Sequence, residues 1–187
     1  MDIKAIPFEN KIFYFLPAES GHTIAVQTHH EDQNSFYQID LLGNVLNTYT
    51  TGPRVILLKY DGDKMFLGQF EKDMPVLQEL YAIDVEGKKI TLPESPESVV
   101  LPDNYHNALT IYESSLSYDQ LQQHPFIKEI YAFHERTDSG FRHVLNVFDE
   151  QIVLHKGTER MIEGGFAVWN EFILTVKEHT EFLIIRS

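Results

Sequence analysis

The sequence predicts an all-β protein, and three observations support this prediction. Short apolar runs rich in Val, Ile, Phe, Tyr and Thr recur along the whole chain, separated by Gly, Asn, Asp and Pro. Helix signals are scarce. A strand–turn motif that begins at Phe36 begins again at Leu80, and such regular recurrence indicates stacked or radial units.

The apolar runs fall into four groups along the chain. The first group comprises Lys11–Leu16, Thr23–Thr28, Ser35–Leu41 and Val45–Tyr49. The second comprises Arg54–Tyr60, Lys64–Phe70, Leu77–Val85 and Lys88–Leu92. The third comprises Asn107–Glu113, Phe126–His134 and Arg142–Phe148. The chain closes with Gln151–His155, Phe166–Trp169, Phe172–Val176 and Glu181–Arg186. Strands at this spacing favour a sandwich, barrel or propeller.

One short segment favours a helix. Ser114–Gln123 begins with serines that suit an N-cap, and Pro125 follows its end. The prolines of Leu92–Tyr105 predict a loop between units. Because no low-complexity linker divides the chain, we expect one all-β repeat domain over residues 1–187.

The repeated motif reads apolar-Tyr-x-Ile-Asp-apolar-x-Gly-polar in Phe36–Asn44 and Leu80–Lys88. A third, degraded copy is Ile130–His134, in which His134 replaces the Asp. The Asp side chain accepts backbone N–H bonds in a tight turn, and the Gly supplies positive φ. The motif therefore predicts a strand, a turn and an antiparallel return. We expect its apolar side chains to be mostly buried at equivalent positions: Tyr37, Ile39, Tyr81, Ile83, Tyr131 and Phe133.

At these residues the chain resembles a β-propeller repeat. The segment Leu80–Ile90 is similar to the strand–turn–strand signature of quinoprotein-type (PQQ-like) repeats and, more loosely, to the turn of WD40 repeats. The pattern is also similar to that of a bacterial domain family of unknown function with such repeats. Quinoprotein repeats carry docking tryptophans, whereas the single Trp here, Trp169, lies outside the motif copies. We therefore expect no bound cofactor.

The resemblance implies a propeller-like array of antiparallel units with three to four strands each. At about 45 residues per blade, the length of 187 residues allows about four units. The last unit holds about three strands, and Ile3–Phe8 is the segment that adds an outer strand and closes the ring. The alternatives are an open array, a ring completed by a second copy in a homodimer, and a β-sandwich of repeated hairpins.

Charge and composition exclude several function classes. The chain has 15 Lys and Arg against 28 Asp and Glu, a net charge of −13, which disfavours nucleic acids and anionic membranes as partners. It has no Cys, which excludes thiolate zinc sites and a cysteine nucleophile. No apolar run approaches the ~20 residues that span a bilayer. The N-terminus lacks a basic segment followed by an apolar one, so we expect a cytoplasmic protein.

The candidate ligand-binding residues come from three places. His29, His30, Glu31 and Asp32 follow a predicted strand and are expected in a hairpin loop, and Tyr118 lies in the longer loop Glu113–Pro125. His134 and His143 flank the turn Glu135–Gly140, so they are expected on paired strands. With Glu135 or Asp138 they would form an acid–base or metal pair; the alternative is a cross-strand surface pair.

These residues do not define a catalytic or metal site. Adjacent histidines on a strand point to opposite faces and chelate poorly, so no metal is expected. The sequence therefore favours a non-catalytic binding or scaffold module for a protein, peptide or glycan. The alternative is a hydrolase or lyase that acts on a glycan or small polar substrate, with catalytic residues unassigned.

Overall fold

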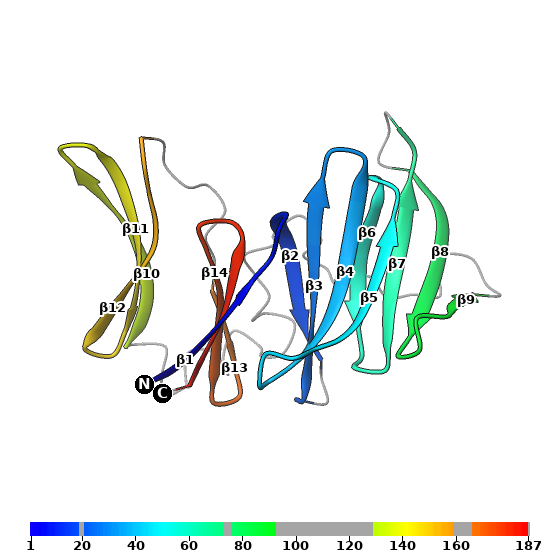
Figure 1. Ribbon diagram of the computed structural model, residues 1–187, viewed down its shortest axis with the longest axis horizontal. Helices are drawn as coiled ribbons and strands as arrows, with labels where there is room; N and C mark the ends of the chain where they lie inside the picture. The colour runs from blue at the N-terminus through cyan, green and yellow to red at the C-terminus, as the bar shows by residue number, and fades with distance from the viewer. Residues whose placement is uncertain (19–20, 73–75, 93–128, 159–165, 187) are drawn as a thin grey trace. The chain divides into compact units, whose positions relative to one another are not determined.

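The computed structural model describes residues 1–18, 21–72, 76–92, 129–158 and 166–186, and every helix or strand assigned within them is a β-strand. The prediction of an all-β chain is confirmed. The chain divides into two compact units: a terminal unit, Met1–Pro7 with Asn107–Ser187, and a central unit, Phe8–His106. Two antiparallel sheets form the described part of each unit (Figure 1).

The central unit contains two four-stranded sheets in which strands adjacent in the chain are adjacent in the sheet. The first sheet comprises β2 (Lys11–Pro17), β3 (Thr23–His30), β4 (Gln33–Asp40) and β5 (Val45–Thr51). The second comprises β6 (Val55–Tyr60), β7 (Lys64–Phe70), β8 (Leu77–Asp84) and β9 (Lys89–Thr91). All eight strands were predicted from the apolar runs, with small differences at their ends.

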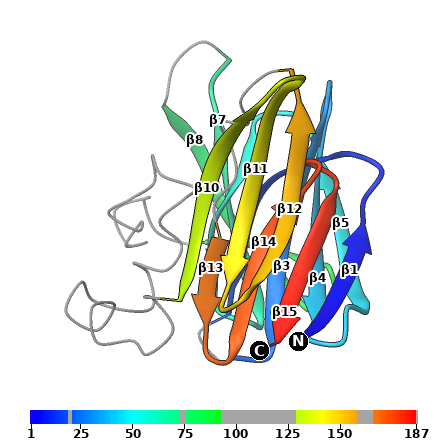
Figure 2. The same ribbon diagram turned by 90° about the vertical axis from the view of Figure 1, so that its left-hand side faces the viewer.

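The terminal unit contains a three-stranded and a four-stranded sheet, which Figure 2 shows face on. The first comprises β10 (Ile130–Thr137), β11 (Gly140–Val147) and β12 (Glu150–Gly157). The second comprises β13 (Phe166–Trp169), β14 (Phe172–Lys177), β15 (Glu181–Arg186) and β1 (Asp2–Pro7). The strand predicted at Gln151–His155 therefore pairs with the preceding hairpin rather than with the last strands of the chain.

The two ends of the chain lie side by side in one sheet. Strand β1 pairs antiparallel with β15, from Asp2 opposite Arg186 to Pro7 opposite Glu181. The prediction that the N-terminal segment adds the outer strand of the last unit is confirmed at this pairing. The helix predicted at Ser114–Gln123 and the strand at Asn107–Glu113 lie outside the described residues.

The first motif copy forms the predicted turn between β4 and β5. The Oδ1 atom of Asp40 accepts backbone N–H bonds from Leu42 at 2.9 Å and Asn44 at 2.8 Å. Gly43 has φ of 87°, a left-handed conformation that glycine adopts without strain. Partial burial raises the pKa of Asp40, but hydrogen bonds from Asn44, Leu42 and Gly43 outweigh burial and hold this pKa below its usual value.

The second copy forms the same turn between β8 and β9. The Oδ1 atom of Asp84 accepts from the N–H of Glu86 at 3.0 Å and of Lys88 at 2.8 Å, and Gly87 has φ of 77°. The two copies occupy the third strand of their sheets. The repeat read from the sequence is therefore a structural repeat in the central unit.

The third copy departs from this pattern. It lies on β10, the first described strand of its sheet rather than the third. Tyr131 is 51% exposed and Phe133 is half-buried, whereas Ile39, Tyr81 and Ile83 are buried and Tyr37 is half-buried. The expectation of equivalent, mostly buried positions is therefore wrong for the third copy. Strands β4 and β8 have a neighbour on each side, whereas β10 pairs only with β11 among the described strands.

Apolar side chains pack between the two sheets of the terminal unit. This cluster comprises Ile130, Leu145, Val147, Leu154, Val168, Ile173, Leu183 and Ile185. The middle strands of the sheets are buried on both faces, because consecutive residues are buried in each of them. Such runs are Ile24–Thr28, Leu80–Ile83, His143–Val147 and Phe182–Ile185.

The first sheet of the central unit also binds β6 through buried polar side chains. The Nδ2 atom of Asn34 donates to the carbonyls of Pro53 at 2.9 Å and Val55 at 2.7 Å. The Nε2 atom of Gln38 donates to the hydroxyl of Tyr60 at 2.8 Å. Because β6 is an edge strand of its sheet, the bond from Asn34 to the carbonyl of Val55 gives a partner to a buried backbone group of this edge.

Candidate functional site

The first candidate residues lie at the β3–β4 hairpin of the central unit. Strand β3 extends through His30, and cross-strand pairing continues from His29 opposite Asn34 to His30 opposite Gln33. The expected loop is therefore a two-residue turn, and the expectation that the histidines lie in a loop is wrong. Glu31 takes the left-handed conformation of the turn, with φ of 32°.

The two histidines of this hairpin have different roles. The Nδ1 atom of His29 lies 2.7 Å from Oδ1 of Asn34, whose side chain is buried. Since the Asn34 amide nitrogen already donates to two carbonyls, its oxygen accepts from His29. His29 is thus part of the hydrogen-bonded structure, while His30, Glu31 and Asp32 are exposed at the tip. Tyr118 lies outside the described residues.

The second candidate pair lies in the terminal unit, where His134 on β10 is directly opposite His143 on β11. Their rings stack with centroids 4.2 Å apart and planes inclined by 5°. His143 is 2% exposed and His134 is half-buried. The expectation that these histidines occupy paired strands is confirmed.

The carboxylates expected beside this pair are elsewhere. Glu135 follows His134 on β10, so its side chain points to the other face of the sheet. There its carboxylate forms an ion pair with Arg142 at 2.8 Å. Asp138 is exposed in the turn between β10 and β11. The structure therefore brings the two histidines together without either carboxylate.

A third strand extends the histidine pair. His155 on β12 lies opposite His143, and its ring is 5.4 Å from that of His179 in the turn between β14 and β15. We call His134, His143, His155 and His179 the histidine row. Val147 lies opposite Glu150 at the turn, and a register shift between His143 and Val144 brings His155, rather than Leu154, opposite His143. Sequence spacing alone therefore does not indicate this neighbour.

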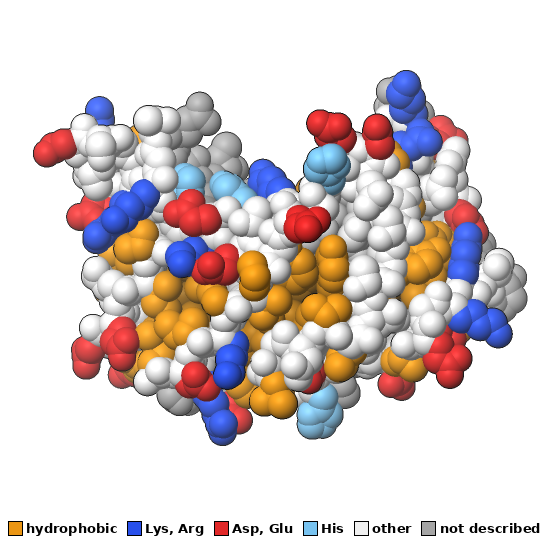
Figure 3. All heavy atoms as spheres, in the orientation of Figure 1, with side chains coloured by type: hydrophobic (Ala, Val, Ile, Leu, Met, Phe, Trp, Pro, Cys, Tyr) orange, Lys and Arg blue, Asp and Glu red, His pale blue; other side chains and the backbone are white. Residues whose placement is uncertain are grey.

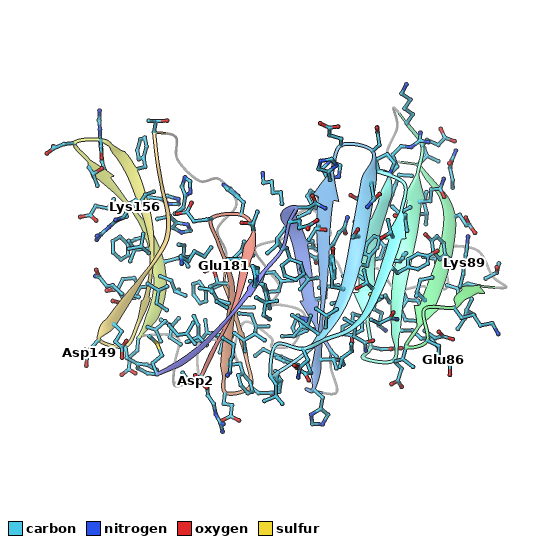
Figure 4. All side chains as sticks on the ribbon, viewed as in Figure 1. Asp2, Glu86, Lys89, Asp149, Lys156 and Glu181 are labelled. Atoms are coloured by element: carbon cyan, nitrogen blue, oxygen red, sulfur yellow. The ribbon has the colours of Figure 1, made fainter. Side chains whose placement is uncertain are left out.

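Glu178 anchors the end of the histidine row. Its carboxylate lies 2.8 Å from Nδ1 of His155 and accepts from the backbone N–H of Lys156 at 3.3 Å. Its own N–H donates to the carbonyl of Leu154 at 2.8 Å. These three contacts join the β14–β15 turn to β12, the strand whose end is marked by the label of Lys156 in Figure 4.

The turn that carries Glu178 has an uncommon backbone. Glu178 and His179 have φ of 48° and 63°, in the left-handed region that non-glycine residues rarely occupy. Such conformations cost of order 1–3 kcal/mol in the most strained cases and persist where surrounding contacts fix them. The Glu178 contacts with β12 supply that restraint.

The chemistry of His155 follows from its partner. A carboxylate only accepts, so Nδ1 of His155 donates to Glu178, and in the neutral ring Nε2 is left as an acceptor. A Cβ atom at position 157 would lie 2.7 Å from Nε2, so Gly157 makes room for the ring. Within the described ranges, no group of three or more His, Cys, Asp or Glu side chains is arranged to hold a metal ion.

Surface charge is mixed on the face that Figure 3 draws, where acidic and basic side chains are interspersed. The described part of the chain contains no helix that is long and apolar enough to cross a membrane. No family model, curated protein or solved structure matches the chain.

Proposed function

We propose that the chain is a non-catalytic binding module whose four sheets are the blades of a propeller-like array. The observation that carries the proposal is strand order. Each sheet is an antiparallel meander in chain order, and the last one is completed by β1 from the other end of the chain. This order is typical of propellers, which repeat sheets of about four strands around a centre.

Burial supports an array over the sandwich alternative. An antiparallel sandwich buries one face of each sheet and exposes the other, which gives alternating burial along a strand. Here consecutive residues are buried in the middle strands of all four sheets, as in Ile24–Thr28 and His143–Val147. Sheets that are covered on both sides fit a repeated array better.

The contacts of the acidic side chains favour a binding module over a hydrolase or a lyase. A general acid–base pair needs a carboxylate or imidazole within hydrogen-bond reach of a reacting group. Glu135 is paired with Arg142 on the face away from the histidine row, and Glu178 holds a backbone turn to β12. These carboxylates therefore have structural partners.

The exposed β3–β4 tip is the proposed ligand contact. It presents His30, Glu31 and Asp32 on a short turn fixed by strands on both sides. With the net charge of −13, the tip favours a cationic or hydroxyl-rich protein, peptide or glycan over a nucleic acid or an anionic membrane.

Selection on a random-peptide library and on a glycan array tests the proposal. Ligands recovered with the wild-type chain are expected to bind the His30→Ala/Asp32→Ala variant at least about 10-fold more weakly, as for loss of central contacts. The matched control is Asp138→Ala/Ser139→Ala in the exposed turn between β10 and β11, which should bind like the wild type. Equal binding by both variants, or turnover of a selected glycan, would contradict the proposal.

A further inference from the structure

Exposed apolar side chains gather at one end of the two sheets of the central unit. Leu42 in the β4–β5 turn is 73% exposed, the highest value among the large hydrophobic side chains of the described residues. Val45 and Leu46 follow at the start of β5, and Val85 lies in the β8–β9 turn. Each of these three is at least half exposed. We call the four residues the turn surface.

The side chain of Asn47 joins the two parts of the turn surface. Its Nδ2 atom donates to the carbonyl of Val85 at 3.2 Å, and its Oδ1 atom accepts from the N–H of Thr48 at 2.8 Å. The start of β5 is therefore fixed against the β8–β9 turn of the other sheet. Consecutive turns of a meander alternate between the two ends of a sheet, so the turn surface lies at the end opposite the β3–β4 tip (Figure 1).

The turns at this end of the central unit are acidic. The β6–β7 turn lies beside β4, because the Nε2 atom of Gln38 donates to the carbonyl of Gly62 at 3.0 Å. Together with the β4–β5 and β8–β9 turns it carries five carboxylates and one lysine: Asp40, Asp61, Asp63, Asp84, Glu86 and Lys88. The strands that leave two of these turns begin with Lys64 and Lys89, and Lys89 is paired with Glu79 at 2.6 Å. The turn surface is thus bordered by an excess of negative charge, which includes Glu86, labelled in Figure 4.

We propose that the turn surface binds a segment of a partner protein that combines apolar side chains with Lys or Arg. Single exposed apolar residues are ordinary, but a group of them rimmed by polar residues marks a protein-binding surface. The carboxylates around the group attract a cationic segment and give it electrostatic complementarity. The same charges disfavour two other occupants. A second copy would bring like carboxylates together, and an anionic membrane would be repelled.

This inference goes beyond the proposed ligand contact, because it concerns the opposite end of the sheets. Fluorescence anisotropy with three labelled synthetic peptides of equal length tests it. The first repeats Leu-Leu-Lys, the second replaces every Leu with Ser, and the third replaces every Lys with Glu. The Leu/Lys peptide should bind the wild type at least about 10-fold more tightly than either of the others, since it alone offers both apolar area and positive charge.

Loss of exposed apolar area should weaken this binding. The variant Leu46→Ser/Val85→Ser should bind the Leu/Lys peptide at least about 10-fold more weakly, as for loss of central contacts. The matched control Phe13→Ser/Val76→Ser changes two other exposed apolar residues of the central unit and should bind like the wild type. Far-ultraviolet circular dichroism checks the fold of each variant, and the comparison of the three peptides needs only the wild type.

Loss of charge should weaken the binding only at low salt. The variant Asp63→Asn/Glu86→Gln removes two exposed carboxylates, and its deficit should disappear at high salt, which screens exposed charges. The matched control Asp138→Asn/Glu150→Gln removes two exposed carboxylates of the terminal unit and should bind like the wild type.

Several results would overturn the proposal. They are absence of binding by the Leu/Lys peptide at about 1 mM, equal binding by the Ser/Lys peptide, and equal weakening by the two serine variants. Self-association that Leu46→Ser/Val85→Ser abolishes, in a wild type that does not bind the peptide, would assign the surface to a second copy instead. The variant His30→Ala/Asp32→Ala should bind the Leu/Lys peptide like the wild type, which separates this test from that of the β3–β4 tip.

Discussion

The side-chain amide of Gln27 on β3 pairs with the backbone of Leu57 on β6. Leu57 donates its N–H to Oε1 of Gln27 at 3.0 Å, and Nε2 of Gln27 donates to the carbonyl of Val55 at 3.3 Å. These are the two bonds that a residue of a neighbouring strand would form. Because Gln27 and Leu57 are both buried, the amide substitutes for water and for a missing strand at this edge.

Replacing Gln27 with Leu should therefore destabilise the chain. The variant Gln27→Leu keeps a similar size but leaves the buried N–H of Leu57 without its acceptor, which costs about 1–3 kcal/mol. Urea unfolding measures the change in free energy. The control Gln151→Leu changes an exposed glutamine on β12 and should stay within about 0.5 kcal/mol. Equal effects of the two substitutions would show that the Gln27 bonds are unimportant.

The hairpin histidines should differ in their effect on stability. His29→Ala removes the donor to the buried Asn34 amide and should lower the free energy of unfolding by about 1 kcal/mol. His30→Ala changes an exposed side chain and should have little effect. Thermal melting of both variants provides the comparison. Identical melting temperatures would exclude the structural role of His29.

The repeated turns should respond alike to loss of their aspartates. Asp40→Ala and Asp84→Ala each remove an acceptor of two backbone N–H bonds, which should cost about 1 kcal/mol in each turn. The midpoints of urea unfolding measure the loss of stability in the two variants. A matched loss at the two positions supports the structural repeat, whereas a loss at only one position contradicts it.

The charge of Asp40 adds a pH dependence to its turn. Its pKa is lowered in the folded state, so its charge stabilises the fold above the unfolded pKa of about 3.9. This contribution to stability is lost as the pH falls through the lower pKa that Asp40 has in the folded state. Asp40→Asn keeps the acceptor oxygen but removes the charge, so it should be less stable than the wild type at neutral pH. The difference in free energy of unfolding between the wild type and Asp40→Asn should shrink in strong acid. A difference that grows on acidification would contradict a lowered pKa of Asp40 in the folded state.

Glu178 should stabilise the terminal unit more than an exposed ion pair does. Glu178→Ala removes the carboxylate contacts with His155 and Lys156 and should lower the free energy of unfolding by about 1 kcal/mol. The control Glu171→Ala breaks the exposed pair with Arg186 and should change it by less than about 0.5 kcal/mol. Equal effects would mean that the turn is held by its backbone bond alone.

Local patterns in the sequence predicted the strands and two of the repeated turns. Alternating apolar runs reveal strands because side chains alternate across a sheet, and the Asp and Gly of Phe36–Asn44 define turn chemistry within a few residues. The prediction of a buried Tyr131 in the third copy was wrong. The burial of this side chain depends on the strands beside β10, and the residues of β10 do not indicate those neighbours. The pairing of β1 with β15 joins residues from the two ends of the chain, and in the sequence only the missing outer strand of the last unit indicates it.

The site was harder to predict because it depends on register and on contacts between sheets. The opposition of His134 and His143 followed from a turn between them. The addition of His155 required the next hairpin register, which a bulge shifts between His143 and Val144. Glu178 and His179 come from a different sheet, and no spacing in the sequence relates them to His155.

The pairing of the first and last strands is the claim on which the proposed array most depends. Asp2 on β1, labelled in Figure 4, lies opposite Arg186 on β15, and both side chains are exposed. Opposed residues in an antiparallel pair have the Cα separation that a disulfide needs. Since the chain has no cysteine, Asp2→Cys/Arg186→Cys introduces the only two thiols.

Mild oxidation of this variant, followed by mass spectrometry and melting with and without reductant, is the most direct test. We predict a near-complete intramolecular disulfide and a higher melting temperature in the oxidised form, because the bond closes almost the whole chain. The control Asp2→Cys/Asp149→Cys joins strand β1 to a turn in the other sheet of the terminal unit and should form little disulfide. Absence of the 2–186 bond, or equal bonding in the control, would contradict closure of the last sheet by the first strand.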